Sequence, residues 1–193
     1  AGIMPNKVAS LTSVSGTHKG SPVASLIMNV DGTILGTAGS AIVNFFSGAI
    51  TWSQGLNPKS YPHDALAAGR SISVEGSTQF NTRFPMGVPT TACGSGAATV
   101  NNIKFYSWGG TSPLTNVLDP TDALLGLTSL VTSQANDGLV TQCSSHLGVV
   151  LRDNYSMNHL DEVNLMFGLR NIFATDPKSV YREHANRLKL AGL

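Results

Sequence analysis

Segments with the pattern of β-strands alternate with helical segments along this chain. Three segments rich in β-branched and aromatic residues are predicted strands, at residues 7–14, 103–108 and 148–152. Predicted helices occupy residues 64–70, 73–84 and 122–127, and a last helix follows Asp176. This alternation predicts an α/β fold in which helices flank a parallel sheet. Three strands are too few for a full doubly wound sheet, so residues 1–193 are expected to form an incomplete domain.

The helix boundaries carry recognisable capping signals. Ser73 is a good N-cap for the helix over residues 73–84. Asp176 is expected to cap the last helix, with Pro177 at its first position. An apolar stripe at helical spacing then follows, formed by Val180, Tyr181, His184 and Leu188.

An acid and a histidine lie close to the ends of predicted strands. Asp137 belongs to Asn136-Asp137-Gly138, which alone predicts only a turn, and His159 alone is most simply a surface or core histidine. Together they match the last two members of a serine-hydrolase triad, in the order acid then histidine that α/β-hydrolases use. No Gly-x-Ser-x-Gly nucleophile elbow occurs in residues 1–193. We therefore expect part of the catalytic machinery to lie outside this sequence.

Composition narrows the classes of partner and compartment. Charged residues make up 12% of the chain and the net charge is +1. Since Lys and Arg form no cluster, nucleic acid is not expected as a partner. The stretch over residues 33–52 is too polar to be a transmembrane segment, and residues 1–5 lack the features of a signal peptide. A weakly charged surface of this kind suits a secreted protein. Because no signal peptide is present, either the leader has been removed or the chain begins within a longer protein.

Two cysteines and several carboxylates allow more than one assignment. Cys93 and Cys143 form either one disulfide or two buried thiols, and a bridge would be worth about 4 kcal/mol in the chain-entropy model. Asp119 and Asp161 could share a calcium ion, because calcium prefers several oxygen ligands. A zinc site at His159 and Asp161 is the rival, although no third histidine ligand lies nearby in the sequence.

Several short motifs of the sequence resemble those of one known family, the bacterial true lipases, which are secreted, foldase-dependent triacylglycerol lipases. The motifs span essentially the whole chain and are specific only in combination. They are Val8-Ala9-Ser10, His18-Lys19-Gly20-Ser21, Arg83-Phe84-Pro85, Phe105-Tyr106-Ser107-Trp108-Gly109-Gly110, Leu118-Asp119-Pro120, Asn136-Asp137-Gly138-Leu139-Val140, Cys143-Ser144-Ser145, Asn158-His159-Leu160-Asp161-Glu162-Val163-Asn164 and Ala185-Asn186-Arg187-Leu188-Lys189.

The resemblance implies a role for each candidate residue. Asp137 would be the triad acid and His159 the triad base. Asp119 and Asp161 would bind calcium, together with the main-chain carbonyls of Leu165 and Leu169, and Cys93 and Cys143 would form the family's disulfide. Residues 31–52 would form a helical lid whose apolar face includes Ile42, Phe45 and Phe46. The implied activity is hydrolysis of acylglycerols at a lipid–water interface by a secreted enzyme that folds with a dedicated foldase.

Three features depart from the family pattern. Leu165 stands where glutamine is usual, and Thr17 stands where proline is usual before His18. The oxyanion segment and the serine elbow are not in the sequence, so the chain corresponds to the rear two-thirds of such a lipase. We expect this chain alone to have no lipase turnover.

Two further interpretations remain open on the sequence. A non-catalytic extracellular binding domain could keep a hydrolase scaffold without its chemistry. The amphipathic pattern of the supposed lid is also typical of a buried core helix.

Overall fold

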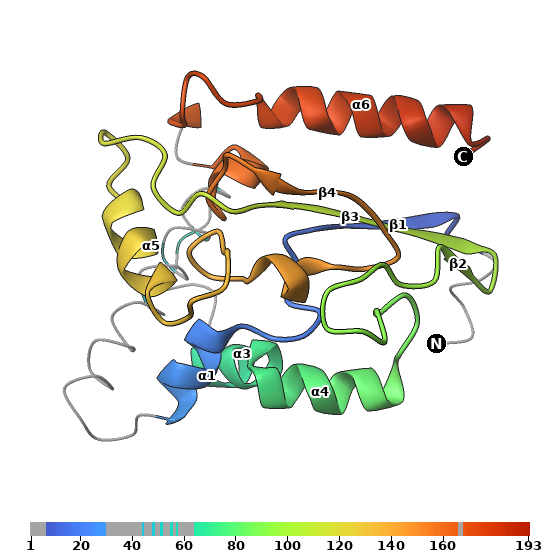
Figure 1. Cartoon of the computed structure of the whole chain (residues 1–193), viewed down its shortest axis with the longest axis horizontal. Coiled ribbons are helices and arrows are strands. Elements are labelled where there is room, and N and C mark those ends of the chain that lie inside the picture. The colour runs from blue at the N-terminus through green and yellow to red at the C-terminus, as the bar shows by residue number, and fades with distance from the viewer. Residues whose placement is uncertain are drawn as a thin grey trace.

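The computed structural model describes residues 7–29, 44, 48, 51, 55, 57, 64–165 and 168–193 (Figure 1). In chain order the elements are β1 Ser10–Val14, α1 Pro22–Asn29, α3 Ala65–Ile72, α4 Val74–Arg83, β2 Thr99–Val100, β3 Ile103–Gly110, α5 Asp122–Ser129, the 3-10 helix η2 Gln142–Ser145, β4 Val149–Tyr155, the 3-10 helix η3 Asp161–Val163 and α6 Pro177–Leu190.

Strand β3 is the centre of the sheet. It pairs in parallel with β1, from Ser10 opposite Lys104 to Val14 opposite Trp108, and in parallel with β4 on its other side. Strand β2 joins β3 as a short antiparallel hairpin. Both residues of its turn, Asn101 and Asn102, have positive φ, which is the conformation of the tight turns that connect hairpin strands.

Helices cover both faces of the sheet (Figure 1). Helix α6 lies on one face, over a core cluster of Trp108, Tyr155, Met157 and Val180. Helices α1, α3 and α4 lie on the opposite side of the sheet in the same view. A second cluster joins Ile103, Phe105 and Leu147. The fold is thus a parallel α/β arrangement of three layers, as the sequence predicts.

The three predicted strands and the capping signals are present, with shifted bounds. Strand β1 begins at Ser10 rather than at residue 7, while β3 and β4 extend further because Gly110 pairs with Tyr155. Ser73 Oγ accepts the amide of Gly76 at 3.0 Å, and Asp176 Oδ1 accepts that of Lys178 at 3.0 Å, so both N-caps are confirmed. Helix α1 and the hairpin strand β2 were not predicted from the sequence.

The apolar stripe of the last helix is only partly correct. Val180 and His184 of α6 are buried, whereas Tyr181 remains 42% exposed. His184 is held by a polar contact, because its Nε2 lies 2.6 Å from Thr12 Oγ1 of β1. This contact fixes α6 across β1 and explains how a histidine can belong to the buried face.

The supposed lid lies largely outside the described residues. Ile42, Phe45 and Phe46, and with them most of residues 31–52, are among the residues that the structure does not describe. Over the described part of the chain, no helix has the length and apolar character needed to cross a membrane.

Candidate active site

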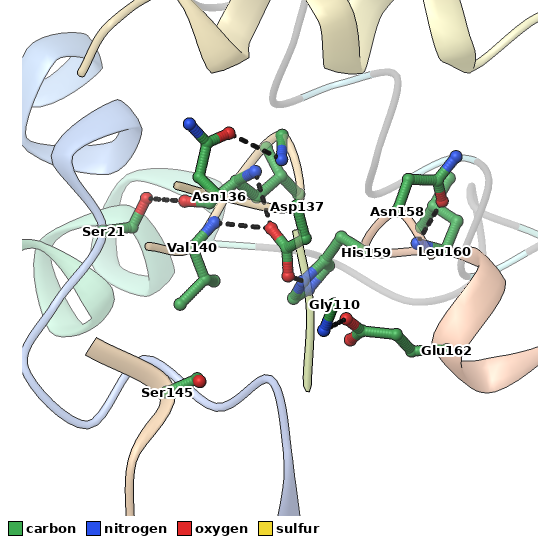
Figure 2. Close-up of polar contacts among 12 residues, drawn as sticks. Ser21, Gly110, Asn136, Asp137, Val140, Ser145, Asn158, His159, Leu160 and Glu162 are labelled. Atoms are coloured by element: carbon green, nitrogen blue, oxygen red, sulfur yellow. Dashed lines mark hydrogen bonds and ion pairs between the residues drawn. The ribbon is translucent and has the colours of Figure 1, made fainter. Parts of the chain in front are cut away.

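A tight turn fixes the carboxylate of Asp137. Asn136 and Thr141 form an isolated antiparallel bridge at its base. Asp137 is 1% exposed, and its Oδ1 accepts the amides of Leu139 and Val140 at 2.9 and 2.8 Å (Figure 2). These two bonds occupy one carboxylate oxygen and leave Oδ2 for a partner outside the turn.

That partner is His159, on the loop that follows β4. The amide of His159 donates to the carbonyl of Asp137 at 3.0 Å, and its ring Nδ1 lies 2.8 Å from Asp137 Oδ2 (Figure 2). The structure thus brings together the two residues that the sequence predicts as acid and base. An Nδ1–H donor facing a carboxylate leaves the lone pair on Nε2, which is the arrangement that a general base needs.

Burial and charge act in opposite directions on His159. Burial lowers the pKa of its imidazole, but the carboxylate of Asp137 and its hydrogen bond outweigh this effect, and Glu162 adds to them, so that the pKa rises from 6.5 to about 9. The His159 side chain is nevertheless 28% exposed. The side chain is therefore partly accessible while Asp137 stabilises its protonated form.

Glu162 is a third member of this cluster that sequence analysis did not single out. It is 1% exposed, and its Oε1 accepts the amide of Gly110 at 2.5 Å. Burial raises the pKa of its carboxyl group, as does the neighbouring carboxylate of Asp137. Its place only three residues after His159, within the short 3-10 helix η3, was the signal that the sequence offered.

Ligand atoms of Asp137, His159 and Glu162 lie within 4.8 Å of one another, which is close enough to hold a metal ion. Several of the candidate ligand atoms already have hydrogen-bond partners, however. His159 Nδ1 pairs with Asp137 Oδ2, the other Asp137 oxygen takes two amides, and Glu162 binds Gly110. This cluster differs from the rival zinc hypothesis, which named His159 and Asp161, and the Asp137–His159 contact within it has the geometry of an acid–base pair.

The loop after β1 is held against the same site. Its Thr17 and His18 carbonyls accept side-chain bonds from Ser77 and Asn81 of α4, at 3.0 and 2.7 Å. Ser21 Oγ donates to the carbonyl of Leu139, in the Asp137 turn, at 2.6 Å. The loop is thus tied both to α4 and to the turn that carries Asp137.

His18 does not share the environment of His159. Burial lowers the pKa of His18 to about 4, and its Nε2 lies 2.6 Å from Ser13 Oγ. It is consequently neutral near pH 7, and its contact with β1 is structural.

A second group of carboxylates lies beside the histidine loop. Asp119 is buried, and its Oδ1 accepts both the amide and the hydroxyl of Thr121, at 2.7 and 2.6 Å. Asp161 is also buried, and its Oδ2 accepts the amide of Asn158 at 3.3 Å. The remaining oxygens, Asp119 Oδ2 and Asp161 Oδ1, have no hydrogen-bond partner. Buried carboxylate oxygens without a donor fit a bound cation.

The charge state of Asp161 fits the same interpretation. Burial above all, together with the carboxylates of Asp122 and Asp119, raises its pKa from 3.8 to about 6 against the effect of its hydrogen bonds. The two carbonyl candidates lie on the next stretch of chain. Leu165 O accepts the amide of Gly168 at 3.1 Å, and Leu165 and Leu169 are both partly buried.

The two cysteines form a disulfide. Cys93 and Cys143 have their Cα atoms 4.6 Å apart, so the alternative of two free thiols is wrong. The segment that contains Cys93 is held at a second point, where His146 Nδ1 lies 2.9 Å from the carbonyl of Gly94. His146 Nε2 in turn lies 3.0 Å from Asp153 Oδ2 of β4. This second histidine–aspartate pair is structural.

Comparison with known proteins identifies relatives of the chain by sequence and by fold. No family model matches the chain. A triacylglycerol lipase of Vibrio cholerae is 47% identical over 196 residues, covering all of this chain and 62% of its own length. A triacylglycerol lipase of Pseudomonas fragi is 38% identical over 205 residues, covering all of this chain and 69% of its own. The chain thus spans about two-thirds of the length of such relatives.

A solved structure supports the fold. A metagenomic carboxyl esterase matches the whole chain over 51% of its own length, with a TM-score of 0.57 and 16% identity. At that identity the likeness supports the α/β-hydrolase architecture alone. On its sequence similarity, the chain belongs to the family of bacterial triacylglycerol lipases.

Proposed function

We propose that this chain is part of a triacylglycerol lipase that hydrolyses acylglycerol esters by a Ser–Asp–His mechanism. The observation that carries this proposal is the 2.8 Å contact between His159 Nδ1 and Asp137 Oδ2, which leaves Nε2 free to act as the base. The nucleophilic serine and the oxyanion hole would come from residues outside this sequence, since relatives extend well beyond the part that matches.

The chemistry would follow from the atoms in place. His159 Nε2 takes the proton of the serine hydroxyl as the oxygen attacks the ester carbonyl, and then gives that proton to the leaving alcohol. It next takes a proton from the water that releases the acid. Asp137 holds the ring in the required tautomer and stabilises its positive charge in both steps.

The free edge of β1 indicates where the serine would enter. Among the described strands, β1 pairs with β3 on one side only. A parallel strand on its other edge would end beside Ser15, the first residue after β1, whose side chain faces Glu162. Parallel strands present their functional loops at one common edge. A serine at the end of such a strand would therefore lie near His159.

Calcium is the metal that fits the second carboxylate group. The two unpartnered oxygens of Asp119 and Asp161 would take part in its coordination, with the carbonyls of Leu165 and Leu169 as the further candidates. When bound, the ion would neutralise the buried charge and tie the Asp119 loop to the loop of His159. Its role would be structural.

The remaining parts of the proposal rest on the family. Residues 31–52 would form the lid, with Ile42, Phe45 and Phe46 on its apolar face. The enzyme would be secreted, would act at a lipid–water interface and would use a foldase to reach its native state. A non-catalytic binding domain is the alternative to this proposal.

A serine-directed phosphonate ester tests the mechanism, applied to the protein as its source organism produces it. We expect one labelled serine, in a peptide outside residues 1–193, and loss of labelling in a His159→Ala variant. A matched control is His146→Ala, which removes the other histidine paired with an aspartate. Labelling within residues 1–193 would show that the nucleophile is misassigned. A protein without label or ester turnover would favour the binding domain.

A further inference from the structure

Two loops beside the candidate active site end in turns of the same design. In the first, Asn116 Oδ1 accepts the amide of Leu118 at 3.0 Å and Asn116 O accepts that of Asp119 at 2.8 Å. In the second, Asn171 Oδ1 accepts the amide of Phe173 at 2.9 Å and Asn171 O accepts that of Ala174 at 3.1 Å. Each asparagine thus closes a turn through both its side chain and its main chain.

Each turn exposes two large apolar side chains. Val117 and Leu118 are 100% and 73% exposed, and Ile172 and Phe173 are 78% and 91% exposed. We call these four residues the paired-turn surface. Residues 111–118 and 171–175 contain no charged side chain. Exposed apolar groups that are fixed on ordered turns commonly mark a binding surface.

The two turns are joined to each other. Asn116 Nδ2 donates to the carbonyl of Arg170, immediately before the second turn, at 3.0 Å. Arg170 in turn forms an ion pair with Asp176 at 3.3 Å, at the start of α6. The four apolar side chains are therefore presented by one connected unit and not by two independent loops.

The unit is also joined to the histidine loop through Asp122 of α5. One oxygen of the Asp122 carboxylate accepts the amides of Thr115 and Asn116. The other accepts Asn158 Nδ2, one residue before His159, at 2.8 Å. The paired-turn surface is consequently tied through Asp122 to the loop that carries the proposed general base.

We propose that the paired-turn surface inserts into an uncharged lipid surface and holds the enzyme there beside its substrate. This inference rests on the proposed function and adds a lipid contact that does not depend on residues 31–52. Two properties favour lipid as the occupant. The turns satisfy four of their own amides by internal bonds, which lowers the cost of placing these turns in an apolar medium. They also carry no charge that would need a partner on an opposing surface.

Binding to emulsified triolein coated with phosphatidylcholine tests the proposal, with the protein as its source produces it. The test variant is Val117→Ser with Phe173→Ser, and the matched control is Leu190→Ser, which changes a residue 80% exposed at the far end of α6. We expect the double variant to partition at least about tenfold more weakly, and the control to bind as the native protein does. Binding should persist in 0.5 M NaCl, where the Debye length is about 4 Å and electrostatic attraction is screened.

A second variant tests insertion by a gain of signal. Val117→Trp should strengthen binding, and its fluorescence should shift to the blue and be quenched by brominated lipid, because tryptophan favours the lipid–water boundary. Unchanged binding of the double variant, or a tryptophan that stays in water, would overturn the proposal. Dissociation of an oligomer by the double variant, without loss of lipid binding, would show a protein interface instead.

A His159→Ala variant separates this proposal from the proposed function. It should lose turnover and still bind the emulsion as the native protein does. Native turnover on a soluble short-chain ester, combined with equal emulsion binding by all variants, would contradict the proposal that the paired-turn surface binds lipid. The hydrolase proposal would then still stand.

Discussion

Replacing Asp137 with asparagine should remove the charge that stabilises protonated His159 and preserve the local turn. The asparagine side-chain oxygen can still accept the amides of Leu139 and Val140, which now bind Asp137 Oδ1. In place of Oδ2, however, an amide N–H would face His159 Nδ1 at about the present separation of 2.8 Å. The variant therefore isolates the effect of charge and tautomer on the histidine.

The expected loss of unfolding free energy follows from the pKa of His159. A rise from 6.5 to about 9 corresponds to about 3 to 4 kcal/mol, at roughly 1.4 kcal/mol for each pH unit. Because the pKa is raised on folding, this contribution is fully present below pH 6.5 and is lost as the pH rises through about 9. We expect Asp137→Asn to lower the free energy of unfolding by about 3 to 4 kcal/mol at pH 6, and by much less at pH 10.

Urea unfolding from pH 6 to pH 10 in saturating calcium would measure this difference. The matched control is Asp153→Asn, which alters the other histidine–aspartate contact, at 3.0 Å. NMR titration of the His159 ring protons should show its pKa falling below 6.5 in Asp137→Asn, since burial then acts unopposed by that carboxylate. A stability difference that stays constant from pH 6 to pH 10 would refute the assignment of Asp137 as the partner of a charged imidazole.

Three other perturbations test the supporting structure. Removing calcium with EGTA should lower the Tm of the protein by about 5–10 °C in calorimetry if the ion is normally present at about a hundred times its Kd, and Asp161→Asn should abolish that response. Replacing both Cys93 and Cys143 with serine should lower the free energy of unfolding in urea by about 4 kcal/mol, because the bridge closes a loop with a sequence separation of 50. Gly20→Ala should lower Tm far more than Gly192→Ala. Both glycines have positive φ, but a Cβ at Gly20 would lie 2.3 Å from the backbone of α4, and one at Gly192 meets nothing within 4 Å.

Local sequence patterns predicted the strands and caps well. A period of two identifies a strand wherever one face is buried, which is why β1 and β3 were found, with end shifts of a few residues. Asp176 followed by Pro177 defines the start of α6, because both residues act within the first turn. Helix α1 was missed because the loop-like signal before Pro22 hid a short helix of eight residues.

The partners of the buried polar groups were harder to predict from the sequence. Glu162 appeared to be one more acid in a polar loop, yet it is buried against Gly110 and shares the site of His159. The paired-turn surface could not be predicted either. An asparagine followed by two apolar residues predicts no binding surface by itself. Only the hydrogen bond from the Asn116 side chain to the carbonyl of Arg170 places the two turns together.

The sequence by itself determined the α/β class and the family, and it singled out Asp137 and His159 as candidates, because these inferences depend on short-range periodicity and on recognisable motifs. The tertiary structure decided which distant groups meet. It closed the Asp137–His159 contact, joined Cys93 to Cys143 and left one oxygen each on Asp119 and Asp161 without a donor. Such contacts join residues tens of positions apart, and their geometry depends on the packing of the whole sheet.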